Sequence, residues 1–210
     1  MRMARWTVFG ALLCALTAAA AAPAGAVSPA WEIVPGKRIG HVRIGDTRAA
    51  VHAALHAPDV VRPLGGALLQ ERWLSEPVNP SSRAQPPDYV TVYYQDGIVR
   101  QVEVSSWHFE TAGGLSTLSR FQNLEAAYPP TRYVITAFSP SRGGVALRMY
   151  YDDDTRHGIA WKGALESGMI PEITGEFPVE SIIVHGVHKY VIVDPGGHGN
   201  IVGDGPITAP

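Results

Sequence analysis

Apolar and polar residues alternate over short stretches along much of the chain, and this pattern predicts several strands. Alternation predicts strands at residues 41–44, 67–74, 133–138, 145–151 and 159–162. Two helices are expected from apolar residues three and four apart. The first covers about 47–55, capped by Asp46 or Thr47, and turns Val51, Ala54 and Leu55 inward. The second follows the cap candidate Ser116, with Leu118, Phe121 and Leu124 as its apolar stripe and Pro129-Pro130 at its end.

Residues 89–107 carry the clearest hairpin signal, around Gln95-Asp96-Gly97. A two-residue turn would mix apolar and polar side chains on each face. A three-residue turn with a left-handed Gly97 instead gathers one apolar face from Val90, Val92, Tyr94, Ile98, Val102 and Val104. Each large apolar side chain contributes about 1.5–3 kcal/mol when buried, so we expect the three-residue turn. The opposite face is then polar and aromatic, and carries Tyr89, Thr91, Tyr93, Gln101, Glu103, Ser105 and Trp107.

The rest of the pattern predicts connections and a last hairpin. Residues 76–88 hold four prolines and indicate an exposed loop. Asp152, Asp153 and Asp154 indicate a charged, solvated turn. Residues 182–185 and 188–193 should pair as a hairpin about Gly186, and the stretch after Asp194 should be a flexible tail.

This order of elements occurs roughly twice, which predicts an α+β fold of two small helix-on-antiparallel-sheet modules in tandem, preceded by a cleavable signal peptide. The expected boundaries are 1–26 for the signal peptide, 27–110 and 111–194 for the two modules, and 195–210 for the tail.

The stretch from Ile33 to Thr47, followed by Val51, Leu55 and Pro58, resembles the opening of small exported bacterial modules of the BamE/SmpA and β-lactamase-inhibitor-like group. The resemblance implies a short helical segment against a small antiparallel sheet, sometimes repeated. The chain departs from this group at His56, where the pattern has Gly. It also lacks a suitably placed lipid-anchor cysteine and the disulfides of the known inhibitors.

The first 26 residues have the pattern of an export signal. Arg2 and Arg5 precede an apolar run from Trp6 to Ala20, and Ala24-Gly25-Ala26 is a small-x-small cleavage site. Cleavage there would leave 184 of the 210 residues, exported to the periplasm or the medium, with no transmembrane span. It would also remove Cys14, the only cysteine, which excludes disulfides, thiol catalysis and zinc–thiolate sites in the mature chain.

Charge excludes a further class of partner. Without Arg2 and Arg5 the chain has 15 basic and 19 acidic residues, a net charge of −4, and no basic run. A nucleic-acid partner is therefore not expected.

Histidine pairs are the candidates for metal chemistry. His52 and His56 lie four apart on the first expected helix, and His185 and His188 would face each other across the last hairpin, with His198 in the following loop. The competing interpretations are a solvated helix edge and an ordinary hairpin end. The aspartate run lacks the pattern of a calcium loop, the segment Pro195–Gly199 lacks that of a phosphate loop, and no Gly-x-Ser-x-Gly occurs. No cofactor is expected.

The polar and aromatic sheet face is the candidate binding surface, because Tyr, Trp and Arg dominate interface energetics. Its residues are Tyr89, Tyr93, Trp107, Arg148 and Tyr150, with Lys162 nearby. The alternative is that a loop covers these rings.

These features favour a non-enzymatic exported binding protein with a protein or envelope partner. The alternatives are a metal-dependent or hydrolytic envelope enzyme using His185 and His188, and a purely structural envelope component.

Overall fold

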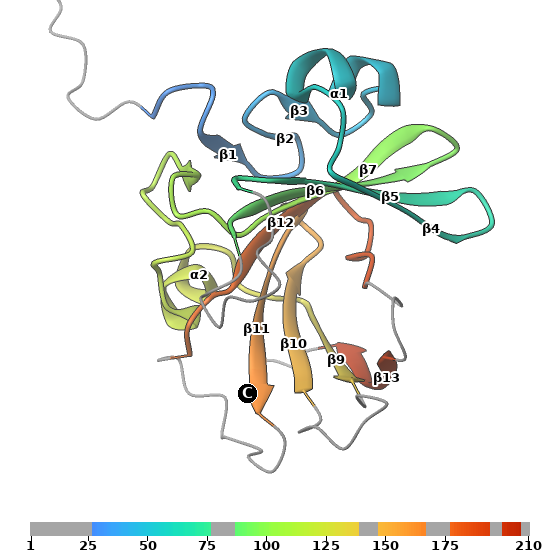
Figure 1. Cartoon of the computed structure of the whole chain (residues 1–210). Coiled ribbons are helices and arrows are strands. Elements are labelled where there is room, and N and C mark those ends of the chain that lie inside the picture. The colour runs from blue at the N-terminus through green and yellow to red at the C-terminus, as the bar shows by residue number, and fades with distance from the viewer. Residues whose placement is uncertain (1–26, 77–86, 139–146, 167–176, 194–198, 207–210) are drawn as a thin grey trace, which may run out of the picture.

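The computed structural model describes residues 27–76, 87–138, 147–166, 177–193 and 199–206. Its main element is a nine-stranded antiparallel sheet in the order β13-β9-β10-β11-β12-β7-β6-β5-β4 (Figure 1). The strands are β4 (Val60–Gly65), β5 (Leu68–Leu74), β6 (Tyr89–Gln95), β7 (Ile98–Val104), β9 (Arg132–Phe138), β10 (Leu147–Asp154), β11 (Ile159–Glu166), β12 (Ser181–His185) and β13 (Gly199–Pro206).

Strand β12 joins the two halves of this sheet. It pairs with β7 on one side, where Ile182 faces Val104, and with β11 on the other, where Ile182 faces Trp161. Strands β4–β7 form one up-and-down run and β9–β11 form another. Figure 1 shows the two runs pointing in different directions, so the sheet is strongly bent.

A second, four-stranded sheet covers one face of the large sheet, in the order β3-β2-β1-β8. It consists of β1 (Glu32–Val34), β2 (Arg38–Ile39), β3 (Val42–Arg43) and β8 (Glu110–Thr111). Helix α1 (Arg48–Leu55) lies on the same side, and α2 (Phe121–Ala127) packs beside β11 (Figure 1). The Thr47 side chain accepts a hydrogen bond from the backbone nitrogen of Ala50 at the start of α1, 3.2 Å away, as expected of a helix cap.

The hairpin of β6 and β7 gathers most of the expected apolar face by a different route, with Val99 in place of Ile98. Asp96 and Gly97 both have positive φ, 55° and 75°, so the turn has two residues and the expected three-residue turn is wrong. An irregularity at Arg100 then shifts the register, and Val92 pairs with Val102 and Val90 with Val104. The bulge, which inserts one residue into β7, restores the apolar face that the turn alone would have broken.

The expected fold class is wrong, because strands from both expected modules belong to one continuous sheet. Two short helices among the described residues do not make two helix-on-sheet modules. The resemblance to the BamE/SmpA and β-lactamase-inhibitor-like group is corrected for the same reason. Residues 33–55 do form short strands and a helix, but these cover one face of a much larger sheet.

Three local expectations also fail. Residues 188–193 do not pair with β12, whose two neighbours are already β7 and β11. The expected tail contains β13, which pairs with β9. Helix α2 begins at Phe121, and Leu118 precedes it with 75% of its surface exposed.

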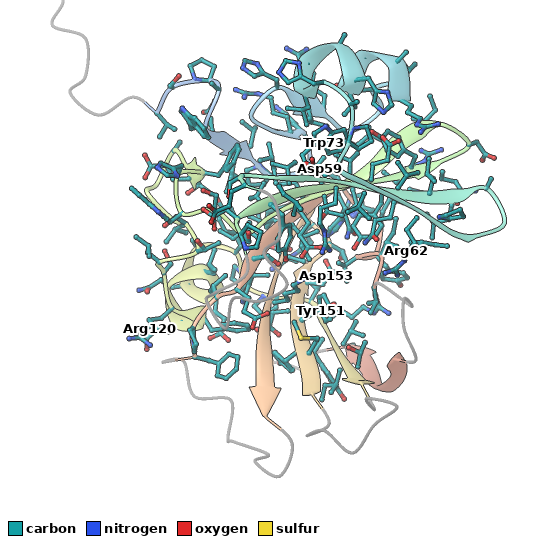
Figure 2. The ribbon with its side chains drawn as sticks, viewed as in Figure 1. Asp59, Arg62, Trp73, Arg120, Tyr151 and Asp153 are labelled. Atoms are coloured by element: carbon teal, nitrogen blue, oxygen red, sulfur yellow. The ribbon has the colours of Figure 1, made fainter. Side chains whose placement is uncertain are left out.

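Both faces of the large sheet are buried along its central strands. The main core lies on the face toward α1 and α2, and includes Val92, Val102, Trp161 and Ile182. A smaller cluster lies on the other face and includes Val134, Tyr151, Ala160, Ile183 and Val191. Figure 2 shows Trp73 on the α1 side, and Asp153 and Tyr151 on the part of β10 that extends away from it. The sheet therefore has no open face along its central strands.

Candidate functional site

A tight turn directly after β7 presents two rings to solvent. The carbonyl of Ser106 accepts a hydrogen bond from the backbone nitrogen of Phe109, 3.4 Å away, which places Trp107 and His108 at the tip of the turn. The buried Ser106 hydroxyl also contacts the His108 ring nitrogen Nδ1 at 3.1 Å. The rings of Trp107 and His108 stack with their centroids 3.9 Å apart. A buried anchor thus holds an exposed aromatic pair.

Neighbouring segments extend this pair into a larger aromatic area. Trp31, just before β1, lies with its ring centroid 5.6 Å from His108 and 5.1 Å from Phe109. Trp31, Trp107 and Leu118 are 46%, 53% and 75% exposed. We call the area formed by Trp31, Trp107, His108, Phe109 and Leu118 the Trp107 surface. Large exposed apolar groups that gather in one place mark interaction sites more often than single ones do.

Three adjoining hollows open on this surface. An apolar hollow of about 490 Å³ lies between Trp31, Leu55, Trp73, Val90 and Phe109. An acidic hollow of about 430 Å³ is lined by Trp107, Leu118 and Pro178, together with two carboxylates. A third hollow of about 570 Å³ is lined by residues that include Trp107, His108 and Asn123.

Shared residues join the hollows. Tyr89 and Asp88 line both the apolar and the acidic hollow. Trp107 lines the acidic and the third hollow, and His108 lines the apolar and the third. The hollows have the size of ligand sites in proteins, which are about 300–1,000 Å³.

The charged groups along these hollows are carboxylates. Asp88 and Glu180 line the acidic hollow and Glu110 lines the third. Burial raises the pKa of Glu180, although Lys162 acts against this shift. Among the described residues that line the three hollows, none is lysine or arginine.

A buried polar cluster supports the wall of the acidic hollow. The Tyr89 hydroxyl donates to Glu103 Oε1 at 2.8 Å, and the Ser181 hydroxyl donates to the same oxygen at 3.0 Å. Lys162 forms an ion pair with Glu103. Burial opposes the charge on Glu103, but Lys162 and these donors outweigh it and hold its pKa below the ordinary value. Burial, with the nearby Glu103 charge, raises the pKa of Tyr89, so its phenol keeps its proton.

The expected binding residues separate in the structure. Trp107 is exposed, and Tyr89 is half-buried at the edge of two hollows. Tyr93 is 1% exposed, and Gln70 donates to its hydroxyl at 2.9 Å. Tyr150 is 9% exposed and packs 6.0 Å from the Phe121 ring. The expectation of an open sheet face is therefore wrong for Tyr93 and Tyr150, while Arg148 lies on β10 with its side chain outside the described residues.

The polar face is buried because another segment of the chain crosses it. Gln101 binds the backbone of Ile192 through two hydrogen bonds, of 2.6 Å and 3.0 Å. Asp153 accepts from the backbone nitrogen of Val191 at 3.0 Å. A covering segment without strand pairing needs side-chain partners for its backbone groups, and the polar face supplies them.

The four described histidine candidates lie apart from one another or are engaged with other groups. His185 is 1% exposed, and its ring nitrogens contact Asp153 Oδ1 at 2.9 Å and the Gly186 carbonyl at 3.0 Å. His188 is exposed beyond the end of β12. His52 contacts Glu71 at 2.8 Å, and His56 follows α1 with a φ of 68°. Within the described part of the chain, no group of three His, Cys, Asp or Glu residues could hold a metal ion.

Other expectations fall in two groups. Asp152, Asp153 and Asp154 are at most 1% exposed within β10, so the expected solvated turn is wrong and the turn follows them. The signal peptide with Cys14, most of the loop 76–88, and His198 with most of its glycine-rich segment lie outside the described residues.

The sequence pattern did not single out Trp31, Phe109 and Leu118 as part of this surface, nor Glu180 in the adjoining acidic hollow. Leu118 was expected on the buried stripe of a helix. The run Trp107-His108-Phe109 was the available signal, because three rings directly after a strand cannot all turn inward.

Among the described residues, no helix combines the length and the apolar character needed to cross a membrane.

Comparison with known proteins does not define a class. No protein family matches the chain, and no curated protein matches it by sequence. The crystal structure of an extracellular protein containing an SCP domain, from Bacillus anthracis str. Ames, aligns with 69% of this chain at 8% identity and a TM-score of 0.39. The chain spans 44% of that structure's length.

Proposed function

We propose that this protein is an exported, non-enzymatic binding protein that captures a protein or envelope partner on the Trp107 surface. One observation carries the proposal: two exposed tryptophan rings border three adjoining hollows. Tryptophan is enriched among the residues that dominate binding energy, especially beside well-packed hollows. The Ser106 anchor supports this role, because a preorganised ring loses little freedom on binding.

Export is proposed from the first 26 residues alone. Their charged start, apolar run and small-x-small end are typical of a cleaved signal. Intact-mass measurement of the protein recovered from producing cells is expected to find a chain beginning at Val27. Recovery of the full 210 residues in the cytosol would contradict this part of the proposal.

The binding role is tested by capture from an envelope extract of the producing cells. Wild-type protein should retain a partner that Trp107→Ala does not retain. Tyr190→Ala is the matched control, because Tyr190 is also exposed, at 67%, and lines a different hollow with Arg132 and Pro206. The proposal fails when the two variants retain the same proteins as the wild type.

A further inference from the structure

We infer that the partner presents a lysine or arginine whose cation enters the acidic hollow beside Trp107, next to an apolar side chain that fills the apolar hollow. This inference rests on the proposed function and names the chemistry of its partner. The two hollows share Asp88 and Tyr89, so one short peptide segment can occupy both.

The charge of the surface favours a cation. Asp88 and Glu180 line the acidic hollow without a lysine or arginine among its described lining residues. A carboxylate that is partly withdrawn from water is stabilised by an incoming positive charge. For Glu180, burial raises the pKa, and a bound cation would offset that cost.

Two cations that lie against the Tyr89 ring, Lys162 and Arg72, already have partners. Lys162 is paired with Glu103 and only 12% of its side chain is exposed. The Arg72 guanidinium lies 4.5 Å from the centre of the Tyr89 ring, and its Nε donates to the Thr91 hydroxyl at 2.9 Å. Lys162 and Glu103 cancel each other's charge, and Arg72 does not line the acidic hollow, so Asp88 and Glu180 are the charged groups among its described lining residues.

Trp107 supplies the second element of a cation site. His108 stacks on the indole at 3.9 Å, while the indole also lines the acidic hollow. Cations bind favourably over tryptophan rings, most of all beside groups partly removed from water. A neutral saccharide could also stack on Trp107, but the charges of Asp88 and Glu180 would not attract it.

The local potential is tested first with ions as probes. Trp107 emission, taken as the difference between wild type and Trp107→Phe, is quenched with caesium and with iodide, each relative to N-acetyltryptophanamide. We expect caesium to be favoured over iodide, and the preference to shrink in Asp88→Asn/Glu180→Gln. A preference for iodide would overturn the inference.

The partner chemistry is tested with a random peptide library displayed against the wild-type protein. Peptides that need Trp107 should carry lysine or arginine beside an apolar residue. Replacing the arginine by citrulline, or the lysine by norleucine, should weaken binding at least tenfold. Glu180→Gln and Asp88→Asn should each weaken it three- to tenfold.

Asp96→Asn is the control, because it removes the same charge from the far end of the β6–β7 hairpin, and it should change nothing. Binders that need Trp107 but show no preference for cations, or that are indifferent to Asp88→Asn and Glu180→Gln, would overturn this inference and leave the proposed function standing. If capture from the extract does not depend on Trp107, both this inference and the proposed function are wrong.

Discussion

Glu103 and Trp107 lie only four positions apart on the chain, and they reverse the usual relation between polarity and burial. Glu103, a charged residue on β7, is 2% exposed, whereas Trp107, a large ring in the following turn, is 53% exposed. Glu103 is buried because Lys162, Tyr89 and Ser181 all contact it. Trp107 is exposed at the tip of a turn, where it stacks on the His108 ring that the buried Ser106 hydroxyl contacts. Glu103 therefore contributes to the stability of the fold, and Trp107 is the residue on which the proposed function depends.

The largest expected effect is the loss of stability in Glu103→Ala. This change leaves Lys162 buried without its partner, and removing one member of a buried pair costs about 3–5 kcal/mol. Urea unfolding monitored by circular dichroism measures it. The double variant Glu103→Leu/Lys162→Met should recover most of the loss, and a cost below about 1 kcal/mol for Glu103→Ala would contradict the assigned pairing.

Asp152 extends the comparison, because it is a buried carboxyl whose surroundings disfavour its charged form, unlike those of Glu103. Burial, with the nearby Glu125, raises the pKa of Asp152 from 3.8 to about 7. The folded protein then holds this proton more tightly than the unfolded chain does, so the free energy of unfolding falls as pH rises from about 4 to 7.

Asp152→Asn should remove this dependence and stabilise the protein at pH 8, by roughly 4 kcal/mol at most for a shift of about three pKa units. Unfolding curves between pH 4 and pH 8 measure the slope, and Asp96→Asn serves as the control. Equal slopes in Asp152→Asn and wild type would refute this account of Asp152.

Trp107→Ala should weaken partner binding and leave stability almost unchanged, whereas Glu103→Ala mainly lowers stability. We expect partner binding to weaken by about 2 kcal/mol or more, roughly thirtyfold, while the free energy of unfolding changes by no more than about 0.5 kcal/mol, as for most surface substitutions. Titration of a captured partner and urea unfolding of the same samples measure the two quantities. A large loss of stability would show that the ring serves the fold.

The smallest effect is expected at the turn that sets the register of β7. Gly97 has a φ of 75° with open space around it, so Gly97→Ala should cost about 1–2 kcal/mol through backbone strain alone. Asp96→Asn should cost little, because asparagine tolerates positive φ. Thermal unfolding compares the two variants, and equal stabilities would contradict the two-residue turn.

Local pattern predicted the local structure of the chain well. The strands at 67–74 and 133–138, the hairpin within 89–107, the helix capped by Thr47, and the apolar face that Val92 shares with Val102 all follow from alternation, capping and burial within short stretches. For the site, the pattern found Trp107 and Tyr89, which lie at the end of one strand and the start of its neighbour. Such features depend on residues close in sequence, so the sequence by itself determined them.

Long-range pairing decided the rest. The two expected modules merge into one sheet because β12 lies between β7 and β11. The sequence of β12 does not predict which strands it pairs with. The backbone at Ile192 then binds Gln101, and Tyr93 is buried as well, although the polarity of both had indicated an open face. The sequence determines which kinds of group each side chain can bind, but the tertiary structure decided whether water, a partner or another segment of the chain contacts it.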